Sequence, residues 1–143
     1  MSKSKPYLAG SPDGIVRDKD NKIKKITEAK CPYTARNFKI IPSVVPYIKR
    51  NSKGKYVLKK KHDYMYQCQG NMFVTGAQKC DLVIYTFKDL VRISIKRDNR
   101  FINKMLRKLD RFYVEHFKSE YVERHLYKKT DGYAFPEALR YRY

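Results

Sequence analysis

Apolar and polar residues alternate in short runs over the first third of the chain, a pattern typical of strands joined by turns. Residues 7–9 form the first run, and the next four residues, Ser11 to Gly14, are turn-forming types. A second strand begins at Ile15, and after the polar segment 18–22 the extended pattern resumes over residues 23–31. We therefore expect an antiparallel hairpin in residues 15–31.

The middle of the chain has a weaker pattern. Residues 34–41 are compatible with a short helix, and two prolines follow, Pro42 and Pro46. The basic stretch 49–55 has the composition of a loop, and residues 56–58 have that of a short strand.

From residue 63 onward the periodicity is clearer. Residues 63–74 fit a helix that Gly76 can end in a left-handed cap, and residues 80–87 and 90–95 fit two strands. A last helix begins near Asp98 and carries an apolar stripe that we expect in the core: Ile102, Met105, Leu106, Leu109, Phe112, Tyr113 and His116. The order of elements predicts one α/β (α+β) domain over residues 1–126, followed by an irregular tail, 127–143.

Composition adds a strong charge imbalance to this fold. The chain has 143 residues, 42% of them apolar, and 33 lysines and arginines against 14 acidic residues give a net charge of +19. The basic residues extend from Lys3 to Arg142, so a folded surface rather than a tail carries the charge. This charge indicates a polyanionic partner. The alternative is a basic surface that is only solvated and binds nothing.

The cysteine pattern and the hydropathy indicate the cellular compartment in which we expect the protein. Cys31, Cys68 and Cys80 include no close pair, so we expect buried thiols in a reducing compartment rather than disulfides or a zinc site with His62. No apolar run approaches the roughly 18 residues of a membrane helix, and no signal peptide precedes the first strand. We expect a soluble, intracellular protein without membrane contact; its sequence does not distinguish nucleus from cytoplasm.

Two carboxylates and a lysine are spaced in a way that is compatible with a catalytic metal site. Asp13 follows Pro12 in the first turn, and after fourteen intervening residues the expected strand contains Glu28-Ala29-Lys30. Since side chains alternate along a strand, Glu28 and Lys30 face the same side, and a hairpin can bring Asp13 to the same point. Such a set can bind Mg²⁺ and hydrolyse a phosphodiester.

Each part of this pattern also has an ordinary explanation. Asp13 is a common turn residue, and Glu28 with Lys30 is a plausible solvated pair on a strand. The triplet Asp20-Asn21-Lys22 also has an acidic residue two before a lysine, but it falls in the expected hairpin turn. On the expected helix, Tyr64, Gln67 and Asn71 form a polar stripe, which is consistent either with a site or with a helix surface.

Three motifs occur together in a fixed order, and they resemble a known family. They are Gly10-Ser11-Pro12-Asp13-Gly14, then Glu28-Ala29-Lys30-Cys31-Pro32-Tyr33, then Tyr64-Met65-Tyr66-Gln67-Cys68-Gln69-Gly70 with Val74-Thr75-Gly76. This order is similar to that of the YqaJ viral recombinase family, which includes the λ exonuclease, within the PD-(D/E)xK superfamily. The resemblance extends from about Tyr7 to Phe117 and implies a restriction-endonuclease-like core with a mixed central sheet flanked by helices.

The resemblance also implies roles for the motif residues. Asp13 and Glu28 would bind the metal with the backbone carbonyl of Ala29, and Lys30 would serve the attacking water. Gln67 would support them, and Tyr64 precedes it in the family pattern Tyr-x-x-Gln; Asn71 is a further supporting candidate from the helical stripe. The implied activity is a Mg²⁺-dependent (or Mn²⁺-dependent) exonuclease on double-stranded DNA, linked to viral or mobile-element recombination. A homotrimer and a single-strand annealing protein are the implied partners.

The N-terminus departs from the family pattern. Relatives usually carry a helical region before the Pro-Asp motif, with an additional acidic residue and an arginine for the DNA-end phosphate. Here twelve residues precede Asp13 and none is acidic, so we expect a core truncated relative to the family and lacking this helix. A catalytically incomplete DNA-binding module is therefore the alternative function. A basic structural protein is a third possibility, but it would need no aligned carboxylates.

Overall fold

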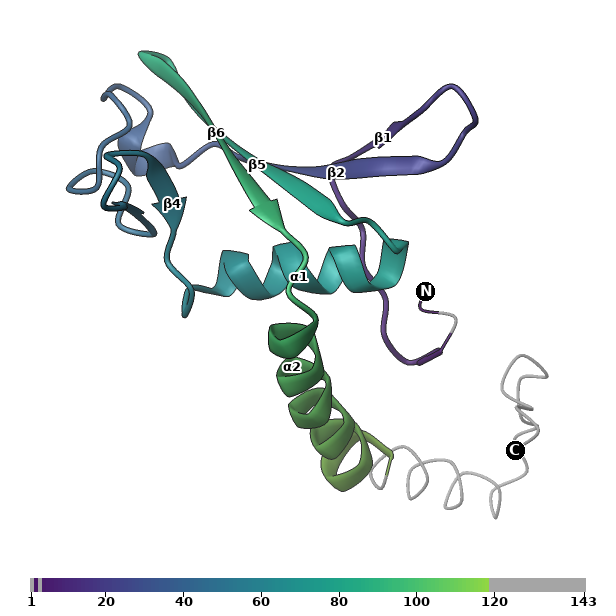
Figure 1. Ribbon diagram of the computed structural model, residues 1–143. Helices are drawn as coiled ribbons and strands as arrows, with labels where there is room; N and C mark the ends of the chain where they lie inside the picture. The colour runs from purple at the N-terminus through teal and green to yellow at the C-terminus, as the bar shows by residue number, and fades with distance from the viewer. Residues whose placement is uncertain (1, 3, 119–143) are drawn as a thin grey trace, which may run out of the picture. The chain divides into compact units, whose positions relative to one another are not determined.

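The computed structural model describes residue 2 and residues 4–118 (Figure 1). The chain divides into two compact units, Met1–Ile102 and Asn103–Tyr143. Every strand in the described part belongs to the first unit. The irregular tail predicted for residues 127–143 lies outside the described residues.

A four-stranded mixed sheet forms the centre of the first unit. Its order is β1 (Gly14–Arg17), β2 (Ile23–Lys30), β5 (Lys79–Thr86) and β6 (Asp89–Lys96). β1 pairs antiparallel with β2, β2 pairs parallel with β5, and β5 pairs antiparallel with β6. The predicted first hairpin and the predicted α/β class are both confirmed.

The helix α1 (Asp63–Thr75) connects the two halves of the sheet and packs on one of its faces (Figure 1). His62 caps its first turn, because His62 Nδ1 accepts a hydrogen bond of 3.2 Å from the Tyr64 N–H. Gly76 ends it at φ 78°, a left-handed conformation that glycine adopts without steric cost. The face of the sheet below α1 is apolar because alternate strand residues point there and are buried: Ile26, Cys80, Leu82, Ile84, Ile93 and Ile95.

A second, two-stranded sheet precedes α1. β3 (Ile48–Arg50) pairs antiparallel with β4 (Tyr56–Leu58). The prediction of a loop over residues 49–55 is therefore wrong for residues 49 and 50, which belong to β3. Asn51 makes the turn possible, because its Oδ1 accepts hydrogen bonds of 3.0 Å from the Lys53 and Lys55 N–H groups.

The helix expected over residues 34–41 is also absent; only the single turn η1 (Tyr33–Ala35) forms. After a local bond from the Phe38 N–H to the Ala35 carbonyl, several groups of this segment bond to residues at the β5–β6 turn. The Ile40 N–H donates to Asp89 Oδ2 at 3.2 Å, and the Phe38 carbonyl accepts from the Thr86 hydroxyl at 2.8 Å. Tertiary hydrogen bonds here replace local helical ones.

Residues 7–9 do not form the expected strand. The Leu8 N–H bonds to the Lys5 carbonyl at 2.9 Å, and the Leu8 carbonyl accepts from the Ser2 N–H at 2.8 Å. These are turn bonds, and they use the backbone groups that a neighbouring strand would need.

The helix α2 (Asn99–Phe112) begins where predicted and continues into the π-helical turn η2 (Tyr113–Lys118). Asp98 Oδ1 caps it by accepting a hydrogen bond of 3.0 Å from the Phe101 N–H. The first stripe residues are buried, but Leu109 and Phe112 are 37% and 60% exposed, so the prediction that the whole stripe is core is wrong. The described residues include no helix that is both long enough and apolar enough to cross a membrane.

Two of the three cysteines are buried as expected. Cys68 on α1 and Cys80 on β5 lie in the core, whereas Cys31 is exposed. The expectation for Cys31 is wrong because β2 ends at Lys30, so that Cys31 has already left the sheet.

Candidate active site

The first hairpin brings Asp13 next to the Glu-x-Lys segment, as the spacing predicted. Asp13 directly precedes β1, and Gly14 pairs with Thr27 across the hairpin. Asp13 Oδ2 accepts a hydrogen bond of 2.7 Å from the Ala29 N–H. This bond fixes the exposed carboxylate beside the end of β2, between the positions of Glu28 and Lys30.

Glu28 is the buried centre of the site. Its side chain is 0% exposed, and α1 supplies both of its amide donors. Gln67 Nε2 donates to Oε2 at 2.9 Å, and Asn71 Nδ2 donates to Oε1 at 2.5 Å. Residues four apart on a helix share one side, so a single helix can hold both carboxylate oxygens.

The electrostatic environment of Glu28 does not favour its ionised form. Burial raises the pKa of Glu28 above its ordinary value of 4.5, and the nearby Asp13 carboxylate raises it further. The hydrogen bond from Asn71 and the positive charge of Lys30 act in the opposite direction. A cation between the two carboxylates would relieve both unfavourable effects.

Lys30 is positioned by a carboxylate and an aromatic ring. Its Nζ lies 3.8 Å from Glu28 Oε2 and 4.7 Å from the centroid of the Tyr64 ring. Tyr64 in turn packs edge-on against Tyr47, at 4.9 Å between centroids, and against His62 at 4.8 Å. A three-ring cluster therefore holds the ring that Lys30 covers.

Tyr47 has an unusual environment within this cluster. Its hydroxyl is buried and has no hydrogen-bond partner among the described residues. Burial, with smaller contributions from Tyr64 and Cys31, raises the pKa of Tyr47 to about 12. Tyr47 therefore remains protonated at physiological pH and serves the cluster as a neutral ring.

The backbone of the N-terminal segment closes over Asn71. A Cβ atom added at Gly10 would lie 2.3 Å from Asn71 Oδ1, a distance that forces a displacement. Only glycine allows the segment to pass this close to the amide that holds Glu28.

The chemistry of these donors fits a hard divalent cation. Asp13 and Glu28 supply oxygen ligands, and the described residues contain no cluster of three or more histidine, cysteine or acidic side chains. Mg²⁺ commonly uses one or two carboxylates and retains several waters, so two carboxylates suffice for it. A thiol- or imidazole-rich zinc site is not formed by this part of the chain.

The predicted site residues lie close together, and two residues of α1 hold Glu28 directly. Asn71, expected only as a supporting residue, bonds to Glu28 as directly as Gln67 does. Tyr47 and His62 were not assigned to the site, and Gly10 was noted only as the first residue of the Gly10–Gly14 motif. The contacts of Tyr47 with Tyr64 and of Gly10 with Asn71 join segments that are distant in the chain, so no local pattern predicts them.

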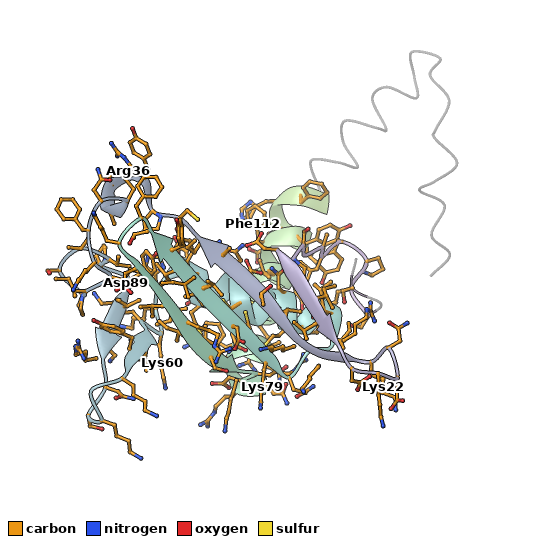
Figure 2. All side chains as sticks on the ribbon, turned by 90° about the horizontal axis from the view of Figure 1, so that it is seen from above. Lys22, Arg36, Lys60, Lys79, Asp89 and Phe112 are labelled. Carbon is orange, nitrogen blue, oxygen red and sulfur yellow. The ribbon has the colours of Figure 1, made fainter. Side chains whose placement is uncertain are left out.

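Basic side chains occupy several separate parts of the folded surface. Figure 2 shows Lys22, Arg36, Lys60 and Lys79 extending outward at different points around the sheet. The charge is thus distributed over the folded surface, as expected from the spread of basic residues.

A mixed sheet that carries two carboxylates and a lysine at the end of one hairpin defines the class: a restriction-endonuclease-like PD-(D/E)xK core. The family model of the YqaJ-like viral recombinase domain matches residues 1–78, more than half of the chain. The chain belongs to this family, and the matched segment contains every residue of the site described above.

Solved structures give a consistent result. The chain is similar to LHK-Exo, an alkaline exonuclease from Laribacter hongkongensis, in two crystal structures, one of them in complex with dAMP. In each the identity is 28% and the TM-score 0.56, and the similarity covers 82% of this chain and 54% of the exonuclease. The chain thus spans about half the length of that enzyme. No curated protein sequence matches it.

Proposed function

We propose that this chain is the catalytic core of a Mg²⁺-dependent exonuclease that hydrolyses double-stranded DNA, with Mn²⁺ as an alternative cofactor. The observation that carries the proposal is the buried Glu28 carboxylate, held by two amides and adjoined by Asp13 and Lys30. A protein that needed only a stable fold would gain little from burying a carboxylate whose pKa is raised by its surroundings.

Each residue has a distinct role in the proposed reaction. Asp13 and Glu28 would hold the metal together with the Ala29 carbonyl, and the metal would supply a polarised phosphate oxygen and a more acidic bound water. Gln67 and Asn71 keep the Glu28 oxygens oriented. Lys30 carries a positive charge beside the carboxylates, where it can orient the attacking water and stabilise charge that develops on the phosphate.

LHK-Exo supports the substrate class, since its name describes an alkaline exonuclease and one of its structures contains dAMP. The family description supports a role in recombination of viral or other mobile DNA. The net charge of +19 supports a polyanionic substrate on physical grounds.

The test compares the wild type with Asp13→Ala and Lys30→Ala on linear duplex DNA, with Mg²⁺ and with EDTA. We expect the wild type with Mg²⁺ to release nucleotides from linear DNA and to leave a covalently closed circle intact. Both variants and the EDTA sample should release none. A wild-type protein that binds duplex DNA and never shortens it would instead favour the DNA-binding module.

A further inference from the structure

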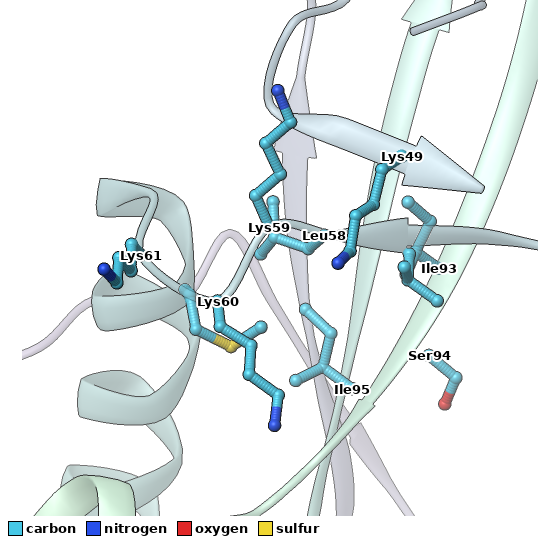
Figure 3. Close-up of a pocket in the computed structure, with 10 residues that line it drawn as sticks. Lys49, Leu58, Lys59, Lys60, Lys61, Ile93, Ser94 and Ile95 are labelled. Carbon is cyan, nitrogen blue, oxygen red and sulfur yellow. The ribbon is translucent and has the colours of Figure 1, made fainter. Parts of the chain in front are cut away.

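A groove separate from the active site lies where β4, β6 and the start of α1 meet (Figure 3). It encloses about 700 Å³. Its floor is aliphatic and consists of Val57, Leu58, Met65, Ile93 and Ile95. Its remaining lining residues are four lysines and one serine, and no acidic side chain is among them.

The lysines do not contribute equally to this groove. Figure 3 shows that Lys49, from β3, and Lys60, from the segment before α1, point their ammonium groups over the aliphatic floor. Lys59 and Lys61 point away from it. Lys49 pairs directly with Val57 across the β3–β4 hairpin, which places this lysine and one floor residue on the same face of the hairpin.

The aliphatic floor and the two lysines above it, Lys49 and Lys60, together indicate the kind of ligand. A nucleotide in a single strand exposes both an anionic phosphate and a largely apolar base, whereas the bases of a duplex are stacked and covered. A duplex backbone would use the lysines but would leave the floor empty. We propose that this groove binds a single strand of DNA, with phosphates near Lys49 and Lys60 and bases on the aliphatic floor.

The first turn of α1 links this groove to the active site. Met65 belongs to the groove floor, and the preceding residue, Tyr64, contacts Lys30 in the site. Consecutive residues of α1 thus contact the site and the groove. The inference rests on the proposed function, because the nuclease reaction would supply the single strand.

The experiment measures binding in EDTA, so that no DNA is cut. The probes are a fluorescent oligothymidylate of about 12 nucleotides, within the length that one single-strand binding fold covers, and a duplex of equal length. The test variant is Lys49→Ala with Lys60→Ala. The matched control is Lys24→Ala with Lys88→Ala, which removes the same charge from two exposed lysines outside the groove lining, one on β2 and one at the β5–β6 turn.

We expect the test variant to bind the single strand about tenfold more weakly. The slope of log binding constant against log salt concentration should become shallower by about 0.7 for each phosphate contact that is lost. The control should bind it within about twofold of the wild type, and the two variants should bind the duplex equally. Val57→Glu, which places a carboxylate on the half-buried floor, should weaken single-strand binding as well. Thermal unfolding of each variant identifies any that fails to fold.

Three results would overturn the proposal. An equal loss in test and control would mean that only total charge matters, and an equal loss for duplex and single strand would mean that the groove binds duplex backbone. A groove-dependent affinity for an amphipathic peptide rich in glutamate and leucine, with unchanged DNA binding, would assign the groove to an acidic protein segment. Asp13→Ala should still bind the single strand, so failure of catalysis and failure of this inference are distinguishable.

Discussion

Asn71 Nδ2 donates a hydrogen bond of 2.5 Å to Glu28 Oε1, which joins the middle of α1 to β2 across 43 residues of sequence. Both side chains are buried, and Gln67 on the preceding turn of α1 holds the other oxygen of the same carboxylate. The orientation of Glu28 therefore depends on α1 as much as on β2.

Replacement of Asn71 by alanine should reduce catalysis. Glu28 would lose one of its two amide donors, and residues that orient a metal ligand typically contribute about 10–100-fold to metal affinity or activity. Mg²⁺ titrations of nuclease activity would measure the loss, with Asn37→Ala, an exposed amide on another segment, as the control. Equal activity in Asn71→Ala and wild type would contradict the role given to this amide.

Gly10→Ala should impair the site through Asn71 alone. The new Cβ would lie 2.3 Å from Asn71 Oδ1, so the amide that holds Glu28 must shift. We expect lower activity in the single variant and much less additional loss when Gly10→Ala is made in an Asn71→Ala background. A double-mutant cycle on activity measures this coupling. Additive losses would show that Gly10 acts elsewhere.

Glu28→Gln should abolish cleavage while it stabilises the metal-free protein at neutral pH. Because the pKa of Glu28 is raised in the folded state, folding is favoured below pH 4.5 and this contribution is lost as pH rises through the folded pKa. At neutral pH the buried charge therefore opposes folding. Its removal should add on the order of 1 kcal/mol to the free energy of unfolding, measured by denaturation in EDTA.

Two comparisons check this interpretation of Glu28. The stability difference between Glu28→Gln and wild type should shrink as the pH falls through the raised folded pKa of Glu28, and it should be smallest below pH 4.5, where Glu28 is protonated in both states. Mg²⁺ should raise the Tm of the wild type more than that of the variant. A variant less stable than wild type at every pH would mean that the carboxylate itself supports the fold.

Tyr64→Leu should slow the reaction by displacing Lys30. A cation–π contact contributes about 0.5–2 kcal/mol, so its loss should lower kcat about 2- to 30-fold with a smaller effect on KM. Tyr64→Phe keeps the ring and should retain nearly full activity. Steady-state kinetics of the two variants, made on the same duplex, provide the measurement. Equal losses in both would assign the effect to the hydroxyl instead of the ring.

The ion pair between Lys25 and Asp81, with 2.6 Å between Nζ and Oδ2, should stabilise the opposite face of the sheet. Burial acts to raise the pKa of Asp81, but hydrogen bonds from Lys25 and Ser94 and nearby positive charge hold that pKa below its usual 3.8. This stabilisation is present above pH 3.8 and is lost as the pH falls through the folded pKa.

Lys25→Ala should therefore cost about 1–3 kcal/mol of unfolding free energy at neutral pH, because the buried Asp81 carboxylate loses its partner. Lys24→Ala, which removes an exposed lysine from the neighbouring position of β2, should cost far less. Urea denaturation at pH 7 and at acidic pH measures both variants. A similar cost for the two lysines would indicate that the ion pair contributes nothing specific.

Local patterns in the sequence were sufficient to bring Asp13, Glu28 and Lys30 together as a candidate site. The period-2 alternation of residues 23–31 determined that Glu28 and Lys30 share a face, and the turn at Asp13 set the third group beside them. Asp98 and Gly76 determined where α2 begins and α1 ends, because caps depend on a few neighbouring residues. These features follow from local geometry, which the sequence specifies directly.

Only the tertiary structure decided which groups support that segment. Gln67 and Asn71 contact Glu28 because α1 packs on β2, and Tyr47 reaches Tyr64 because the residue just before β3 lies against the start of α1. The same long-range contacts replaced the helix expected at 34–41 by hydrogen bonds to the β5–β6 turn. The sequence by itself thus determined the candidate site residues Asp13, Glu28 and Lys30, while packing between distant segments decided the burial of Glu28, its orientation and its raised pKa.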